Sequence, residues 1–135
     1  MRIAAAVALL SLLVACSGET SPGGDAPPAD AGDQLFPDVV TAAATQSADG
    51  TWRFDVTLSS PYDTTERYAD AWRILAPDGS EVGVRELLHD HQNEQPFTRS
   101  LHGVHIPADV TTVVVEGRDQ VNGWGGGTVE LALVG

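Results

Sequence analysis

Apolar and polar residues alternate along the chain from residue 35 onward, in short runs separated by turn-forming residues. In the clearest alternation, Trp52, Phe54, Val56 and Leu58 are each followed by a polar residue. A period of two is typical of a strand with one buried face, because successive side chains of a strand point to opposite faces. No segment has the apolar spacing of a long helix. The pattern therefore predicts an all-β domain over residues 35–135.

Seven runs of this kind predict seven strands. They cover residues 39–45, 51–58, 71–76, 81–88, 97–106, 112–118 and 128–134. The pairs Asp49-Gly50 and Asp78-Gly79 favour tight turns, because glycine adopts the positive φ that many hairpin turns require. Seven short strands in about 100 residues are typical of an immunoglobulin-like or fibronectin-type β-sandwich. A small barrel is the alternative fold.

The beginning of the chain has a different pattern. Met1 and Arg2 form a short positive start, and residues 3–14 are apolar except for Ser11. A membrane-spanning helix needs about 20 apolar residues, so this stretch is too short to be one. A charged start followed by a short apolar stretch predicts a signal peptide at residues 1–15.

The single cysteine of the chain, Cys16, follows this stretch directly. The sequence Leu13-Val14-Ala15-Cys16 resembles the lipobox of bacterial lipoproteins. The resemblance implies cleavage before Cys16, acylation of this cysteine with palmitate or similar chains, and a membrane anchor. Ser17 in place of aspartate implies the outer membrane if the host is Gram-negative, on either its periplasmic or its surface face. If the host has a single membrane, the same signal implies the outer face of that membrane. The alternative is an ordinary secretory signal in which the cysteine occurs by chance.

Residues 17–34 contain no aromatic or branched apolar side chain and consist largely of Gly, Pro, Ala, Asp and Ser. This composition buries too little apolar surface to offset the entropy of ordering, so residues 16–34 are expected to form a disordered linker that begins at the lipidated cysteine.

The whole chain has 19 acidic side chains, seven arginines, no lysine and a net charge of -12. The charge argues against a nucleic-acid partner, since phosphate binding depends on a basic patch.

The four histidines lie close together in the sequence, at His89, His91, His102 and His105. His89 and His91 are expected to point to the same side of a strand. If the predicted fourth and fifth strands are neighbours, His102 or His105 would approach that pair, and Glu94 or Asp90 would supply an oxygen ligand or orient a ring. Imidazole and carboxylate ligands suit Zn²⁺ or Cu²⁺. The alternative is a solvated turn that carries ordinary surface histidines.

Residues 89–101 read HDHQNEQPFTRSL. This block resembles a motif of uncharacterised exported bacterial proteins, approximately HxHxxEQPFTRSL, and the resemblance continues through residues 118–126. The family pattern has proline between its histidines where this chain has Asp90. The resemblance implies a recurring domain and a candidate site, but no particular reaction. Pro96 and Phe97 also have a structural interpretation, in which the proline ends a turn and the phenylalanine enters the core.

A glycine-rich stretch at residues 123–127 is expected to link the last two strands. Its glycines would leave Trp124 on a mobile loop. Together with Asp119 and Asn122, this tryptophan is a candidate for binding a sugar by stacking, or Ca²⁺ through oxygen atoms. The alternative is a tight turn in which Trp124 folds back onto the core.

No catalytic motif is apparent. Ser100 lies near His102 in the sequence, but there is no nucleophile elbow, so enzymatic activity is not expected. The sequence as a whole predicts a lipid-anchored lipoprotein of the cell envelope, whose immunoglobulin-like domain has a structural role or binds an envelope protein or glycan. The alternative function is a periplasmic or surface protein that binds Zn²⁺ or Cu²⁺ through the histidine cluster.

Overall fold

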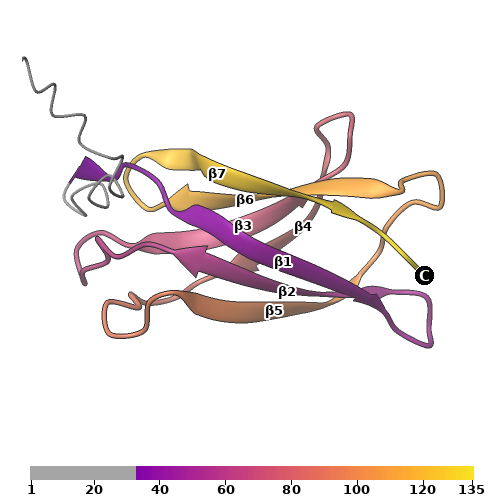
Figure 1. The fold of residues 1–135 in the computed structure, drawn as a ribbon, viewed down its shortest axis with the longest axis horizontal. Coiled ribbons are helices and arrows are strands. Elements are labelled where there is room, and N and C mark those ends of the chain that lie inside the picture. The colour runs from indigo at the N-terminus through magenta and orange to yellow at the C-terminus, as the bar shows by residue number, and fades with distance from the viewer. Residues whose placement is uncertain (1–32) are drawn as a thin grey trace, which may run out of the picture.

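The computed structural model describes residues 33–135; the predicted signal peptide, Cys16 and nearly all of the predicted linker lie outside this range. Seven strands form two antiparallel sheets (Figure 1). The three-stranded sheet has the order β1 (Asp38–Gln46), β2 (Trp52–Ser59), β5 (Phe97–Val104), and the four-stranded sheet has the order β4 (Glu81–Glu86), β3 (Ala69–Leu75), β6 (Thr112–Asp119), β7 (Gly123–Ala132). The prediction of an all-β domain is confirmed. The described residues include no helix of the length and apolar character needed to cross a membrane.

The two Asp-Gly turns form where the sequence predicts them and share one local structure. Between β1 and β2, the Asp49 carboxylate accepts hydrogen bonds from the Thr51 backbone N–H (3.0 Å) and hydroxyl (2.7 Å). Between β3 and β4, Asp78 accepts from the backbone N–H (2.9 Å) and hydroxyl (2.6 Å) of Ser80. The glycine after each aspartate has a φ of 88° or 87°, which glycine adopts without a steric penalty. These turns determine the register of the two hairpins.

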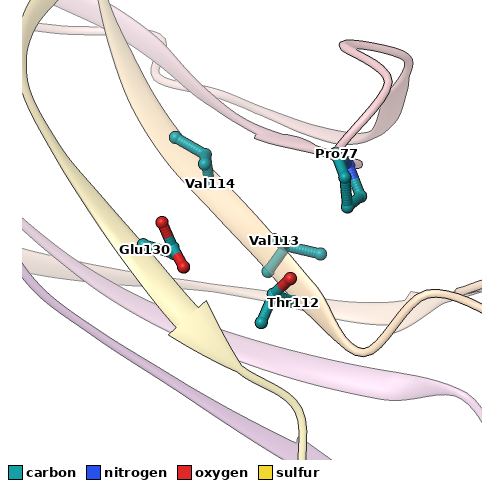
Figure 2. A pocket seen from close by; sticks show the side chains of 5 residues that line it. All are labelled: Pro77, Thr112, Val113, Val114 and Glu130. Carbon is teal, nitrogen blue, oxygen red and sulfur yellow. The ribbon is translucent and has the colours of Figure 1, made fainter.

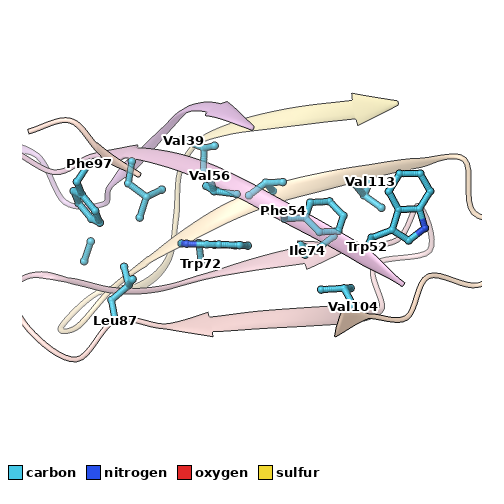
Figure 3. Packing of buried hydrophobic residues seen from close by; sticks show 13 residues of the cluster. Val39, Trp52, Phe54, Val56, Trp72, Ile74, Leu87, Phe97, Val104 and Val113 are labelled. Atoms are coloured by element: carbon cyan, nitrogen blue, oxygen red, sulfur yellow. The ribbon is translucent and has the colours of Figure 1, made fainter. Parts of the chain in front are cut away.

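The hydrophobic core lies between the two sheets (Figure 3). The alternating side chains of β2 that the sequence singles out are all buried, from Trp52 through Leu58. Trp72 of β3 packs against them from the four-stranded sheet and is fully buried. Figure 3 shows Phe97 and Leu87 at one end of this core and Trp52 at the other. Burying each large apolar side chain contributes about 1.5–3 kcal/mol, so this shared core is what holds the sheets together.

β7 begins at Gly123, five residues earlier than the sequence predicts, so the expectation that residues 123–127 link the last two strands, as a mobile loop or as a tight turn, is wrong. These strand positions are occupied by glycine because the segment before β1 packs directly against the strand. A Cβ on Gly125 would lie 2.7 Å from the Phe36 ring, and a Cβ on Gly126 would lie 2.0 Å from the carbonyl oxygen of Pro37. Only a strand without side chains leaves room for this close approach.

The condition under which His102 or His105 would approach the histidine pair, that the fourth and fifth strands be neighbours, is not met. β4 pairs with β3, whereas β5 pairs with β2 in the other sheet. β4 ends at Glu86, so the chain crosses from one sheet to the other through residues 87–96. This crossing segment, which we call the His91 turn, contains both His89 and His91. These histidines are therefore on a connection between sheets and not on a strand.

Candidate functional site

The His91 turn is held to the domain by two polar side chains from elsewhere in the structure. The buried Asp63 carboxylate accepts hydrogen bonds from the backbone N–H groups of His91 (3.0 Å) and Ala69 (3.1 Å). The Gln95 amide accepts from the Ser60 backbone N–H (2.7 Å) and donates to the His91 carbonyl oxygen (3.1 Å). Burial raises the pKa of Asp63, although the two backbone donors act in the opposite direction. The backbone of the turn is thus fixed, which places its side chains in defined positions.

The imidazole of His91 is buried among aromatic rings. It is 5% exposed and stacks on Phe97 with a centroid separation of 3.9 Å and an interplanar angle of 9°. The His89 ring lies next to it, with centroids 4.7 Å apart. Neither ring nitrogen of His91 has a hydrogen-bond partner among the described residues. Burial lowers the pKa of His91, and Arg99 and His89 lower it further, so this imidazole is neutral at pH 7.

A small pocket of about 130 Å³, which we call the His91 pocket, opens beside this ring. It is lined by Arg85, Glu86, Leu87, Leu88, His89, His91 and Arg99. The carboxylates around it already have partners: Glu94 pairs with Arg99 (3.0 Å), Glu86 pairs with Arg118 (3.1 Å), and Asp63 accepts from two backbone N–H groups. Arg85 forms no ion pair within the described residues, and its buried Nε has no hydrogen-bond acceptor there. The pocket therefore combines one guanidinium without a counter-charge with an imidazole that lacks partners.

The structure brings together only part of the predicted metal-ligand set. His89 and His91 are adjacent, and Glu94 is in the same turn but pairs with Arg99. His102 lies five residues beyond Phe97 along β5, which corresponds to about 16 Å at the rise of a strand, and His105 follows the end of that strand. Among residues 33–135, no group of three or more His, Cys, Asp or Glu side chains is placed to hold a metal ion.

The predicted binding residues Asp119 and Asn122 stabilise the turn between β6 and β7. Asp119 is 1% exposed, and its carboxylate accepts from Arg67 Nε (3.1 Å) and from the backbone N–H groups of Val121 (2.9 Å) and Asn122 (2.8 Å). Burial by itself would raise the pKa of Asp119, but Tyr62, these backbone donors and Arg67 outweigh it, so the pKa is lowered. The Asn122 amide also donates to the Leu35 carbonyl oxygen (3.1 Å), which ties the turn to the segment before β1.

Trp124 lies on β7, opposite Arg118 of β6. Two guanidinium groups cover its ring: Arg73 at 4.1 Å and Arg118 at 5.1 Å from the centroid. Arg73 pairs with Glu116 (3.0 Å), and Arg118 pairs with Asp70 (2.7 Å). A sugar that stacked on the covered face of Trp124 would have to displace these guanidinium groups. Sequence reasoning did not identify this cluster, because it depends on which strands are neighbours in the four-stranded sheet.

Another pocket, of about 300 Å³, lies on the four-stranded sheet (Figure 2). It is lined by Pro77, by Thr112, Val113 and Val114 of β6, and by Glu130 of β7. Glu130 is its only charged lining residue, so it lacks the converging polar groups that usually orient a ligand. We therefore regard the His91 pocket as the stronger candidate site.

Comparison with known proteins gives one informative relative. No family model matches the chain, and no solved structure matches it. A protein of Halomicrobium mukohataei named "Putative lipoprotein" is 45% identical over 82 residues, which is 60% of this chain and 40% of the relative. The chain thus spans less than half the length of this relative. The relative's name supports the prediction of a lipoprotein and, with it, of a membrane-anchored envelope location.

Proposed function

We propose that this protein is a lipoprotein anchored in the cell envelope through acyl chains on Cys16, with a β-sandwich domain that binds a partner outside the membrane. The observation that carries the proposal is the position of the single cysteine at the end of a lipobox-like sequence. The name of the Halomicrobium relative supports it independently. A single acyl chain gives only marginal membrane binding, so stable anchoring requires that more than one chain be attached. If the host is Gram-negative, Ser17 favours the outer membrane.

The anchor is tested by labelling cells with an alkyne analogue of palmitate and separating membranes from soluble proteins. The wild-type chain should be labelled and should sediment with the membranes. Cys16→Ser should be unlabelled and should keep its signal peptide, which is visible as a larger mass. Ser17→Ala is the matched control, because it changes the neighbouring residue and leaves the thiol in place. Labelling of Cys16→Ser equal to that of the wild type would contradict the proposal.

The grouping of the strands supports an immunoglobulin-like sandwich of the fibronectin type. β1, β2 and β5 share one sheet and β3, β6 and β7 the other, as the corresponding strands of immunoglobulin domains do. β4 joins the second sheet, which favours the fibronectin type. Such domains commonly serve as binding or structural modules, and an envelope protein or glycan is the proposed partner. Crosslinking in intact cells should enrich a specific envelope component over a control lipoprotein that has an unrelated domain.

The proposal includes no catalytic activity. The only serine that the sequence places near a histidine is Ser100, and its hydroxyl is hydrogen-bonded to Asp55 and lies 3.4 Å from Arg53 Nη2. A nucleophilic serine needs a base that accepts its proton. The acceptor here, Asp55, is a weak base, because the hydrogen bonds from Ser100 and Arg53 lower its pKa. It is also held in an ion pair with Arg53 (2.9 Å).

The alternative function is binding of Zn²⁺ or Cu²⁺ by the pair His89 and His91, to which the described residues add no third ligand in position. The observation that favours it is the 4.7 Å separation of the two imidazole centroids. Calorimetry with ZnCl₂ tests it, because stoichiometric binding that His89→Ala weakens by about tenfold would support a histidine metal site. His102→Ala is the matched control, since His102 is exposed on β5 and remote from the turn.

A further inference from the structure

We propose that the His91 pocket binds a small oxyanion, the carboxylate or phosphate group of a ligand, through the guanidinium of Arg85 and the imidazoles of His91 and His89. This inference names the ligand class for the binding role proposed above and rests on that role, but it does not depend on the lipid anchor.

The ion pairs of the domain single out Arg85. Residues 33–135 contain six arginines, and the other five each pair with a carboxylate. In a chain with 19 acidic side chains, counter-charges are abundant, so an arginine without one is conspicuous. A guanidinium presents a planar fork of N–H donors that matches the oxygens of carboxylates and phosphates.

Buried polar atoms without partners are concentrated at the same place. Five such side-chain atoms occur among the described residues, and three of them belong to Arg85 and His91. A fourth is the indole nitrogen of Trp72, the residue opposite Arg85 in the register of β3 and β4. Figure 3 shows this nitrogen directed toward the end of the core where Leu87 and Phe97 lie. The Arg85 Nε–H, the Trp72 indole N–H and the single N–H of the neutral His91 ring are donors without acceptors within residues 33–135. Buried polar groups are normally hydrogen-bonded, so these donors indicate that an acceptor comes from outside the chain.

The charges around the pocket favour an anion over a cation. Glu86 and Glu94 are paired with Arg118 and Arg99, and the Asp63 carboxylate is held by the backbone N–H groups of His91 and Ala69. Arg85 lines the pocket without a carboxylate partner in the described part of the chain, so a divalent cation would face a guanidinium whose charge is not compensated. A bound anion supplies the counter-charge that Arg85 lacks.

The dimensions of the pocket define which part of a ligand it takes. About 130 Å³ is well below the roughly 300–1,000 Å³ of sites that enclose a drug-sized molecule, so the pocket holds a single acidic group. Leu88 stands at its rim with 84% of its surface exposed, in position to contact the apolar part of a larger ligand. The site is therefore suited to the acidic end group of an envelope peptide or of a phosphorylated glycan.

The test is an NMR titration of the full chain in detergent, with sodium acetate and sodium phosphate as probes and sodium chloride used to keep the ionic strength constant. Saturable shifts of the Arg85 Nε–H, the Trp72 indole N–H and the His91 ring signals are expected. Arg85→Gln should weaken binding by at least about tenfold, and Arg85→Lys, which keeps the charge without the planar fork, by a smaller factor. Tighter binding of acetate points to a carboxylate ligand, and tighter binding of phosphate to a phosphorylated one.

Arg53→Gln is the matched control, because it removes the same charge from an exposed arginine of β2 and should change the affinity by less than about twofold. Three outcomes overturn the inference: no saturable shift with either anion, equal weakening by Arg53→Gln and Arg85→Gln, or stoichiometric Zn²⁺ binding that Arg85→Gln strengthens. Each of them leaves the labelling of Cys16 unaffected, so failure of this inference is distinguishable from failure of the lipid anchor. If the anions bind but crosslinking enriches no envelope component, the proposed binding of an envelope partner is contradicted and the anion site remains supported.

Discussion

The imidazole of His91 lies parallel to the ring of Phe97, with 3.9 Å between their centroids. Phe97 is the first residue of β5 and is almost completely buried in the core. The stacking therefore joins the crossing segment between the sheets to the hydrophobic core. It also places a titratable ring where its charged form is disfavoured, and this has consequences for stability and pH dependence.

Acidification should destabilise the domain through His91. Burial lowers its pKa in the folded state, so between that pKa and the ordinary value of 6.5 the unfolded chain binds more protons. The contribution of a neutral buried His91 is thus complete above pH 6.5 and is lost as the pH falls below it. The midpoint of urea denaturation measured from pH 7.5 to 5.0 should fall for the wild type and fall less for His91→Phe. His102→Gln, an exposed control, should retain the full wild-type dependence; an unchanged slope in His91→Phe would contradict this assignment.

Asp63→Ala should destabilise the domain by about 1–3 kcal/mol, because it leaves the backbone N–H groups of His91 and Ala69 without their acceptor. Chemical denaturation at pH 7 measures the change. Asp109→Ala removes the same charge from an exposed residue and should alter the free energy of unfolding by less than about 0.5 kcal/mol. Equal effects of the two substitutions would show that charge, and not the hydrogen bonds of Asp63, is responsible.

Gly126→Ala should be much more destabilising than Gly50→Ala. Both glycines have a positive φ, 84° and 88°, so both alanines carry backbone strain of about 1–2 kcal/mol. Only at Gly126 would the new Cβ also collide with a backbone atom, the carbonyl oxygen of Pro37, whereas nothing lies within 4 Å at Gly50. The difference between their unfolding free energies isolates the close approach of the segment before β1. If the two values agree, that segment does not pack on β7 as described.

Added salt should stabilise the protein. The net charge of -12 produces repulsion among carboxylates, and NaCl at 1 M reduces the screening length to about 3 Å. The midpoint of thermal unfolding should rise when NaCl is increased from about 0.05 M to about 1 M. The half-buried pair of Arg73 and Glu116 acts in the opposite sense, since salt weakens it. A midpoint that falls with salt would show that such ion pairs outweigh the general repulsion.

All seven strands could be predicted from local pattern, because alternation and turn residues are properties of neighbouring positions. Trp52, Phe54, Val56 and Leu58 are buried as their period of two requires. The start of β7 could not be predicted, because glycines are rare in strands and Phe36, which explains them here, is distant in sequence. The spacing of His89 and His91 correctly indicated adjacent rings, but for the wrong reason, since they lie on a turn.

The sequence by itself determined the strand content, the hairpin turns, the acidic charge and the candidate lipidation site at Cys16, since each depends on composition or on residues close together in the chain. Only the tertiary structure decided that β4 and β5 belong to different sheets, which separates His102 and His105 from His91 and brings Arg85 beside it. The physical reason is that strand pairing depends on burying one shared core between two sheets. That burial is a sum over residues from the whole domain, and no single stretch of sequence contains it.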